Sequence, residues 1–384
     1  MNNKISVRQI SPLLLAFFVM GFVDIVGVST GFVKKDFSLT DDIAQLVPAM
    51  AFLWFFLLSV PVSVIQARYG KRVILNIGML LTGTAMVIPF VFYSFPAMLI
   101  TFLLLGIGNT IVQVPINPLL HDVVPGEKYT SYMSLSQFIK AISSLVGPII
   151  TAWVALQFGD WRLVFAVYAV TSALAVIWLG FTPIQESKLE VGTVSFASAF
   201  RMLKDPFVIL LVGGIFLSVG AEVGLNSNIA NFINITFNIS LEEASFVISY
   251  YYTALMIGRF AGALLLNWFK PGIFLFISSM IAVVSLATFI NAPDLVVAKM
   301  AIFITGLGSA NIFPVLFAIN INHNPERANE LSGLMIMSVV GGAIVPPLMG
   351  VVSVNVGLVA CMYIPLICLL YVLGVSGRLM FKKG

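Results

Sequence analysis

Long apolar segments recur along the whole of this chain of 384 residues. A segment of about 20 apolar residues, rising 1.5 Å per residue as an α-helix, crosses the roughly 30 Å hydrocarbon core of a bilayer. Sixty per cent of the residues are hydrophobic and 9% are charged, whereas soluble globular proteins carry about 25% charged residues. The sequence therefore predicts an all-α membrane protein.

The apolar runs, read between turn residues and charge clusters, predict twelve transmembrane helices. Their ranges are 12–33, 45–66, 73–94, 97–119, 131–156, 161–181, 206–234, 244–266, 272–290, 295–319, 331–354 and 357–378. No stretch between them is long enough to hold a separate domain. The protein is expected to work inside a lipid bilayer.

The basic residues predict the orientation, because cytoplasmic loops of membrane proteins are enriched in Lys and Arg. With both termini in the cytoplasm, only Lys34, Lys35 and Arg162 lie on the outer face. The inner face then holds Lys4, Arg8, Arg68, Lys71, Arg72, Lys128, Lys188, Arg201, Lys204, Lys270, Arg327, Arg378, Lys382 and Lys383. The net charge of +4 thus reflects membrane topology, and no nucleic-acid partner is expected.

The chain also divides into two similar halves. A polar connector at 182–205 separates six spans in 1–181 from six spans in 206–384, and its 196–207 stretch is predicted to form an amphipathic helix on the inner surface. At an offset of about 200 residues, LGIGNTIVQVPIN from Leu105 matches TGLGSANIFPVLF from Thr305, and GFVDIVG from Gly21 matches GAEVGLN from Gly220. Such internal repeats are typical of secondary transporters.

Ionisable residues within the spans are the first candidates for function, because a charge in hydrocarbon is costly. Asp24 lies about 18 Å into the first span, counted from Pro12, and is predicted to bind the coupling proton; the alternative is a permanently paired structural acid. Lys140, near the middle of span five, either neutralises Asp24 or contacts the substrate. Glu222 and Arg259 are a similar couple in the second half, with Glu222 a further candidate for proton coupling.

Amide side chains are the second group of candidates. Those expected to bind a substrate are Asn109, Gln113 and Asn117, spaced every four residues in span four, Asn226 and Asn228 in span seven, and Asn311 in span ten. Amides donate and accept hydrogen bonds, which suits the hydroxyls of a sugar. The alternative is that they hold neighbouring helices together.

Two further expectations concern aromatic residues and helix breaks. Trp54 and Tyr251 are candidates for stacking on a sugar ring, although most aromatic residues of such a chain pack internally or face lipid. Span seven is rich in Gly and Asn, which are poor helix formers, so it is predicted to be interrupted where its backbone lines a binding cavity.

Several motifs resemble those of the major facilitator superfamily. QARYGKR at 66–72 resembles its signature loop between spans two and three, with Ala67 in place of the usual acidic residue, and GDWRLVF at 159–165 resembles the opening of its span six. VDIVGVSTGFVKKDFSL and IGNTIVQVPINPLL are similar to the fucose–proton symporter family, which includes glucose and galactose permeases. That family has a glutamate and an asparagine four residues apart in span four, where this chain has Gln113 and Asn117.

The resemblance implies a twelve-helix transporter that works by alternating access and imports a monosaccharide or similar small polar solute with a proton. Sodium is the alternative coupling ion. The protein is expected to be a monomer in the bacterial inner membrane, with no cofactor and no metal. It would not be an enzyme, since the sequence lacks a metal-ligand cluster, a phosphate-binding glycine loop and a Ser-His-Asp set.

Other transporter and receptor functions remain as alternatives. A proton-driven exporter of drugs or metabolites of this superfamily usually has an arginine near the glycine motif of span four, where this chain has Phe102. Such exporters also have a glycine-rich motif in span five, of which only Gly147 and Pro148 are present. A non-transporting receptor or scaffold is the second alternative.

Overall fold

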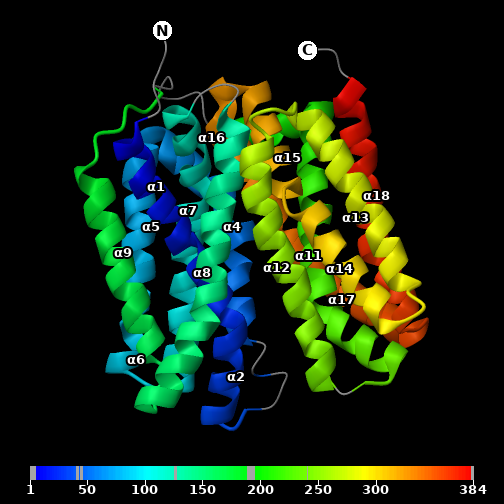
Figure 1. Ribbon diagram of the computed structural model, residues 1–384. Coiled ribbons are helices and arrows are strands. Elements are labelled where there is room, and N and C mark those ends of the chain that lie inside the picture. The colour runs from blue at the N-terminus through cyan, green and yellow to red at the C-terminus, as the bar shows by residue number, and fades with distance from the viewer. Residues whose placement is uncertain are drawn as a thin grey trace. The chain divides into compact units, whose positions relative to one another are not determined.

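The computed structural model describes residues 6–39, 43, 46–124, 128–187, 195–239 and 241–381, and nearly all of these are helical (Figure 1). Eleven helices in this part of the chain are long and apolar enough to cross a membrane. One more long helix, α12 (Leu241–Leu265), lies where the eighth span is predicted. The predicted all-α, twelve-helix membrane fold is confirmed. Lys4, Lys188, Lys382 and Lys383, used above for the orientation, lie outside the described residues.

Before the connector the helices are α1 (Val7–Met20), η1 (Gly21–Ile25), α2 (Val26–Asp36), α4 (Leu46–Tyr69), α5 (Lys71–Ala85), α6 (Ile88–Val91), α7 (Phe95–Val123), α8 (Tyr129–Phe158) and α9 (Leu163–Phe181). The connector contains α10 (Phe196–Arg201) and η3 (Met202–Lys204), within the stretch predicted to be helical. After it come α11 (Pro206–Phe237), α12, α13 (Pro271–Ile290), α14 (Leu295–Ser309), α15 (Ile312–His323), η4 (Pro325–Arg327), α16 (Ala328–Met337), η5 (Ser338–Val340), α17 (Gly341–Asn355) and α18 (Leu358–Phe381).

Contacts group the helices into two compact units. The first unit comprises Met1–Gly126, Ser136–Arg201 and Asn324–Met337, and the second comprises Glu127–Leu135, Met202–His323 and Ser338–Gly384. Helix α16 therefore packs within the first unit, although it follows the connector in the sequence. The division into 1–181 and 206–384 rests on the repeats in the sequence, and it stays a prediction.

Small residues allow the helices of the first unit to approach closely. At Gly106 of α7 an added Cβ would lie 2.2 Å from the carbonyl oxygen of Ala51 in α4, and at Gly78 of α5 it would lie 2.8 Å from the backbone nitrogen of Val112 in α7. Without a hydrophobic driving force between helices in lipid, such close backbone contact is a main source of association. These contacts fix α7, which carries the amide stripe predicted in span four.

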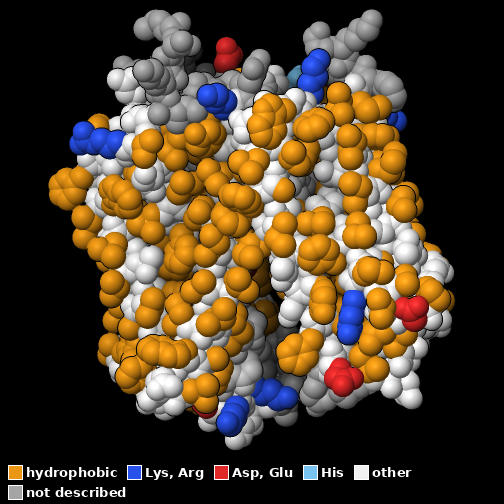
Figure 2. All heavy atoms as spheres, in the orientation of Figure 1, with side chains coloured by type: hydrophobic (Ala, Val, Ile, Leu, Met, Phe, Trp, Pro, Cys, Tyr) orange, Lys and Arg blue, Asp and Glu red, His pale blue; other side chains and the backbone are white. Residues whose placement is uncertain are grey.

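The outward faces of the helices are apolar. Figure 2 shows hydrophobic side chains over most of the visible surface. Leu156 and Phe181 are 84% and 83% exposed, a degree of exposure that is unfavourable in water and favourable against lipid tails.

Polar and aromatic residues join the loops near Tyr93 and Trp161 in the first unit. The indole Nε1 of Trp161 donates to Asp36 at 2.9 Å, and the hydroxyl of Tyr93 also donates to Asp36. Arg162 donates to Asp160 and stacks over the Tyr93 ring at 4.4 Å. Its hydrogen bond holds the pKa of the Asp160 carboxyl below its usual range, while burial raises the pKa of Tyr93. The opening of span six is thus fixed to the end of α2.

The predicted interruption of span seven is wrong. Helix α11 is α-helical over all 32 residues from Pro206 to Phe237. Within it the amide of Asn228 donates to the carbonyl oxygen of Gly224 at 2.9 Å. Lipid offers no partner for an unpaired backbone group, so a continuous helix is retained despite residues of low helix propensity. Interruptions lie in other spans, at η1 in span one, residues 86–87 in span three, residues 310–311 in span ten and η5 in span eleven.

Candidate functional site

Asp24 lies on the interruption of the first span. The five-residue 3₁₀ segment η1 carries it between α1 and α2, and its side chain is exposed while its neighbours Val23 and Ile25 are buried. The hydroxyl of Ser144 in α8 lies within hydrogen-bond reach of both Asp24 and the carbonyl oxygen of Lys140, and it donates to one or the other. Among the described residues, Asp24 is therefore an accessible carboxylate beside the neutral hydroxyl of Ser144.

Lys140 and Asp24 form no ion pair in the structure, which describes both side chains and gives Asp24 the contact with Ser144 instead. The backbone of Lys140 packs on η1, since a Cβ added to Gly21 would lie 2.8 Å from the Lys140 carbonyl oxygen. The half-buried Lys140 side chain is thus available for its alternative role. Its contact with a substrate stays a prediction.

The amide stripe of α7 forms a continuous set of hydrogen bonds. Asn109 Nδ2 donates to the carbonyl oxygen of Met20 at 2.8 Å. Gln113 Nε2 donates to Asn109 Oδ1 at 2.7 Å, and Asn117 Nδ2 donates to the carbonyl oxygen of Gln113 at 2.9 Å. Asn109 is fully buried and Gln113 is 6% exposed. The stripe therefore holds α7 to the end of α1, one residue before η1 begins.

In the second unit the structure brings Glu222 and Arg259 together. Arg259 Nη2 of α12 lies 3.5 Å from Glu222 Oε1 of α11, with side chains that are 16% and 32% exposed, respectively. Tyr251, two turns before Arg259, is fully buried and lines a small cavity with Glu222 and Ser309. The candidate stacking contact of Tyr251 with a sugar stays a prediction.

Asn311 lies at the interruption of span ten. Its Nδ2 donates to the carbonyl oxygen of Gly258 at 2.6 Å, and a Cβ added to Gly262 would lie 2.4 Å from its side chain. Gly262 of α12 therefore makes the space that this amide occupies, and Gly258 of the same helix makes room for Ala310, where a Cβ would lie 2.6 Å from the Ala310 Cβ. The contact fixes the interruption against α12, which supports a structural role beside the predicted contact with a substrate.

Asn226, Asn228 and Trp54 are the remaining candidates for contact with a substrate. Asn226 is half-buried in α11, one turn after Glu222. Trp54 is half-buried in α4, and its indole nitrogen is buried with no hydrogen-bond partner among the described residues. The substrate contacts predicted for Asn226, Asn228 and Trp54 stay predictions.

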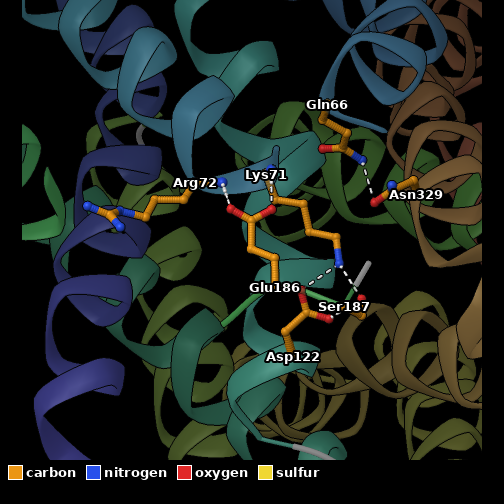
Figure 3. A network of polar contacts seen from close by, with 7 residues as sticks. All are labelled: Gln66, Lys71, Arg72, Asp122, Glu186, Ser187 and Asn329. Carbon is orange, nitrogen blue, oxygen red and sulfur yellow. Dashed lines mark hydrogen bonds and ion pairs between the residues drawn. The ribbon is translucent and has the colours of Figure 1, made fainter. Parts of the chain in front are cut away.

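A polar network around the signature loop was missed by the sequence analysis (Figure 3). Lys71 Nζ lies 2.5 Å from Asp122 Oδ2, and Ser187 donates to the same carboxylate at 2.8 Å. The backbone nitrogens of Lys71 and Arg72 donate to Glu186 at 2.6 and 3.0 Å. These partners are 51 to 116 residues apart, so no local pattern could pair them.

Gly70 makes this arrangement possible, because its φ of +93° lies in a region that favours glycine. The turn ends α4 and starts α5, whose first amides have no partner within the helix. Glu186, from the connector, accepts from them and places negative charge at the positive end of the helix dipole. Glu186 of the connector thus provides a carboxylate at this turn, although Ala67 replaces the acidic residue that the signature loop usually has.

Helix α16 contacts the same region of the first unit. Gln66 Nε2 donates to Asn329 Oδ1 at 3.2 Å (Figure 3), and both side chains are 1% exposed. The hydroxyl of Ser332 donates to the carbonyl oxygen of Val114 at 2.6 Å. The start of span eleven is therefore tied to both α4 and α7.

Comparisons with known proteins agree with this fold. A sequence profile described as "Major Facilitator Superfamily" matches residues 13–346. The chain is 25% identical to a protein named glucose/galactose transporter from Brucella abortus (strain 9-941), over 94% of this chain and 92% of that protein. It is also 25% identical to a putative glucose/galactose transporter from Helicobacter pylori (strain 26695), over 97% of each chain.

Among solved structures, a variant of the fucose:proton symporter FucP of E. coli is similar in fold. The TM-score is 0.86 at 16% sequence identity, and the match covers 99% of this chain and all of that one. The human organic anion transporter TETRAN also matches, with a TM-score of 0.78 at 13% identity over 96% of this chain.

Proposed function

The chain belongs to the Major Facilitator Superfamily, and we propose that it is a secondary active transporter that imports a monosaccharide together with a proton. The relatives named as glucose/galactose transporters match nearly the whole chain and support a hexose as the substrate class. In this mechanism two six-helix halves, 1–181 and 206–384, alternate in exposing the substrate site to either side of the membrane.

The observation that carries the proposal is the accessible carboxylate of Asp24 beside a hydrogen-bonded stripe of amides. Asp24 lies on η1, four residues after Met20, whose carbonyl oxygen accepts from Asn109. A carboxylate that loses and regains a proton in contact with a sugar-binding surface can link the two binding equilibria. Asp24 is the principal proton site in this proposal, and Glu222 is a second one.

Gln113 and Asn117 are the proposed hydrogen-bond partners of the sugar. Gln113 cannot titrate, so the coupling assigned to the span-four acid of the resembled family must come from elsewhere in this chain. A substrate contact is also proposed for Lys140 and, separately, for Asn311. Arg259, whose Nη2 lies 3.5 Å from Glu222 Oε1, is the proposed charge partner of Glu222.

The proposed setting is the inner membrane of a bacterium, with both termini in the cytoplasm, in keeping with the distribution of Lys and Arg. The proposed functional unit is a monomer.

Uptake by purified protein in liposomes tests the proposal. A panel of labelled hexoses is offered with an inward proton gradient, an inward sodium gradient or neither. We expect accumulation of one or more hexoses only with the proton gradient. Accumulation driven by sodium alone would contradict proton coupling, and outward, proton-driven movement of apolar compounds without any hexose uptake would favour the exporter.

A further inference from the structure

A small cavity in the second unit lies beside the Glu222–Arg259 pair. It has room for about 10 Å³ and is lined by residues of α11, α12, α14, α15 and α18. Its polar lining consists of Ser218, Glu222, Tyr251 and Ser309, and the rest is apolar. This volume is about that of one water-sized sphere, so it cannot take a sugar ring.

Two hydroxyls in this cavity have unused hydrogen-bonding capacity. The hydroxyl oxygens of Tyr251 and Ser309 are buried and lie close to each other, but neither makes a hydrogen bond of ordinary geometry within the described part of the chain. Ser218, by contrast, donates to the carbonyl oxygen of Ile215 at 3.1 Å. A buried hydroxyl without a partner destabilises the fold by about 1–3 kcal/mol, which makes two of them in one cavity costly.

The charge in and around the cavity decides what kind of ligand fits. Glu222 supplies a carboxylate, but Arg259 lies 3.5 Å from it and balances its charge. A sodium ion would bring a second positive charge to a carboxylate that is already paired. A neutral ligand that both donates and accepts hydrogen bonds meets the hydroxyls and the carboxylate without that cost.

We propose that this cavity binds one water molecule, which joins Tyr251 and Ser309 to Glu222. The water accepts hydrogen bonds from the two hydroxyls and donates to the carboxylate, giving it the roughly three partners that buried waters have. Ser309 is the last residue of α14, directly before the interruption of span ten. The water therefore links this interruption to α11 and α12. The site does not depend on which substrate is transported.

The test is a double-mutant cycle on thermal unfolding of the purified protein in detergent, without sugar and without sodium. The variants are Tyr251→Phe, Ser309→Ala and both together, with Tyr250→Phe, on an exposed neighbour, as the control. Each single variant should lower the Tm by a few degrees, because loss of the water strands the other hydroxyl. The double variant should be no less stable than the worse single one, and the control should match the parent.

If the cavity holds no water and the two hydroxyls have no partner, the change in Tm of each single variant has the opposite sign, and the proposal is overturned. Each substitution then removes an unsatisfied group, so both singles raise the Tm and their effects add. Coupling that appears only when a hexose is present would assign the site to a substrate hydroxyl, and a rise in the Tm of the parent alone on adding sodium would assign it to a cation. An experimental structure of the parent should show solvent density within hydrogen-bond distance of Tyr251, Ser309 and Glu222. Coupled variants without that density would mean that the two hydroxyls bond each other directly, and this would overturn the proposal.

Discussion

Lys71 and Asp122 form an ion pair with 2.5 Å between Nζ and Oδ2, and their side chains are only 3% and 5% exposed. The pair joins the first residue of α5 to the end of α7. Because both charges are removed from water, each depends on the other for compensation, and Ser187 donates to the same carboxylate. Loss of one partner therefore leaves a buried charge, which costs about 3–5 kcal/mol.

We expect Lys71→Met to destabilise the protein severely, and the double variant Lys71→Met with Asp122→Leu to recover much of the loss. Thermal unfolding in detergent measures both. The matched control is Arg162→Met, because Arg162 and Asp160 form an ion pair whose side chains are 29% and 30% exposed, and exposed pairs contribute about 0–1 kcal/mol. Equal effects of Lys71→Met and Arg162→Met would contradict the assigned burial.

Asp24→Asn should separate exchange from accumulation. The variant resembles the permanently protonated state, so the loaded carrier still reorients and exchanges labelled for unlabelled hexose. It cannot release its proton, so the empty carrier does not return and uphill uptake is lost. The affinity for the sugar should also lose its pH dependence, as reciprocal linkage between proton and sugar requires.

Counterflow and gradient-driven uptake in liposomes measure the two activities, and Ser144→Ala is a matched variant that removes the neighbouring hydroxyl and keeps the carboxylate. If Asp24→Asn concentrates hexose as well as the parent does, Asp24 is not the coupling site, and Glu222 becomes the candidate to test.

The two acid–base couples should behave differently in double-mutant cycles. Glu222 and Arg259 are in contact, so the destabilisation caused by Glu222→Gln and Arg259→Met should be less than additive in the double variant. Asp24 instead has Ser144 as its partner, so Asp24→Asn and Lys140→Met should be closer to additive than the variants of the Glu222–Arg259 pair. Strong coupling between Asp24 and Lys140 would show that the pair forms in solution.

The amide stripe combines a structural role with proposed sugar binding, and substitutions should distinguish them. Asn109→Ala removes the acceptor of Gln113 Nε2, which lies on a side chain only 6% exposed, so it should lower stability by about 1–3 kcal/mol. Gln113→Ala and Asn117→Ala should weaken hexose binding more than tenfold in a folded protein. Calorimetry of purified variants measures the binding. Unchanged affinity in both would leave the whole stripe with a structural role.

Sequence patterns predicted the helices well because length and apolarity are local properties. The continuity of each helix and the partners of its polar side chains depend on tertiary contacts, which a local sequence pattern does not reveal. The Gly- and Asn-rich composition of span seven suggested an interruption, yet α11 is continuous because hydrocarbon penalises unpaired backbone groups more than propensity differences. Asp24 and Lys140 lie at similar depth, but depth alone does not determine which side chains meet. Glu186 carried no local signal, because its partners are the first amides of a helix more than 100 residues away.

The interruptions of the spans have a consequence for the history of the chain. Span one is interrupted at Asp24, whereas its counterpart at the repeat offset, span seven, is continuous. Span ten is interrupted next to Asn311, whereas its counterpart, span four, is continuous. If one ancestral unit was duplicated, the two copies have diverged, because their interruptions lie in helices that do not correspond. Corresponding positions in the two repeats should therefore tolerate different substitutions, and residues grafted from one repeat into the other should not restore its activity.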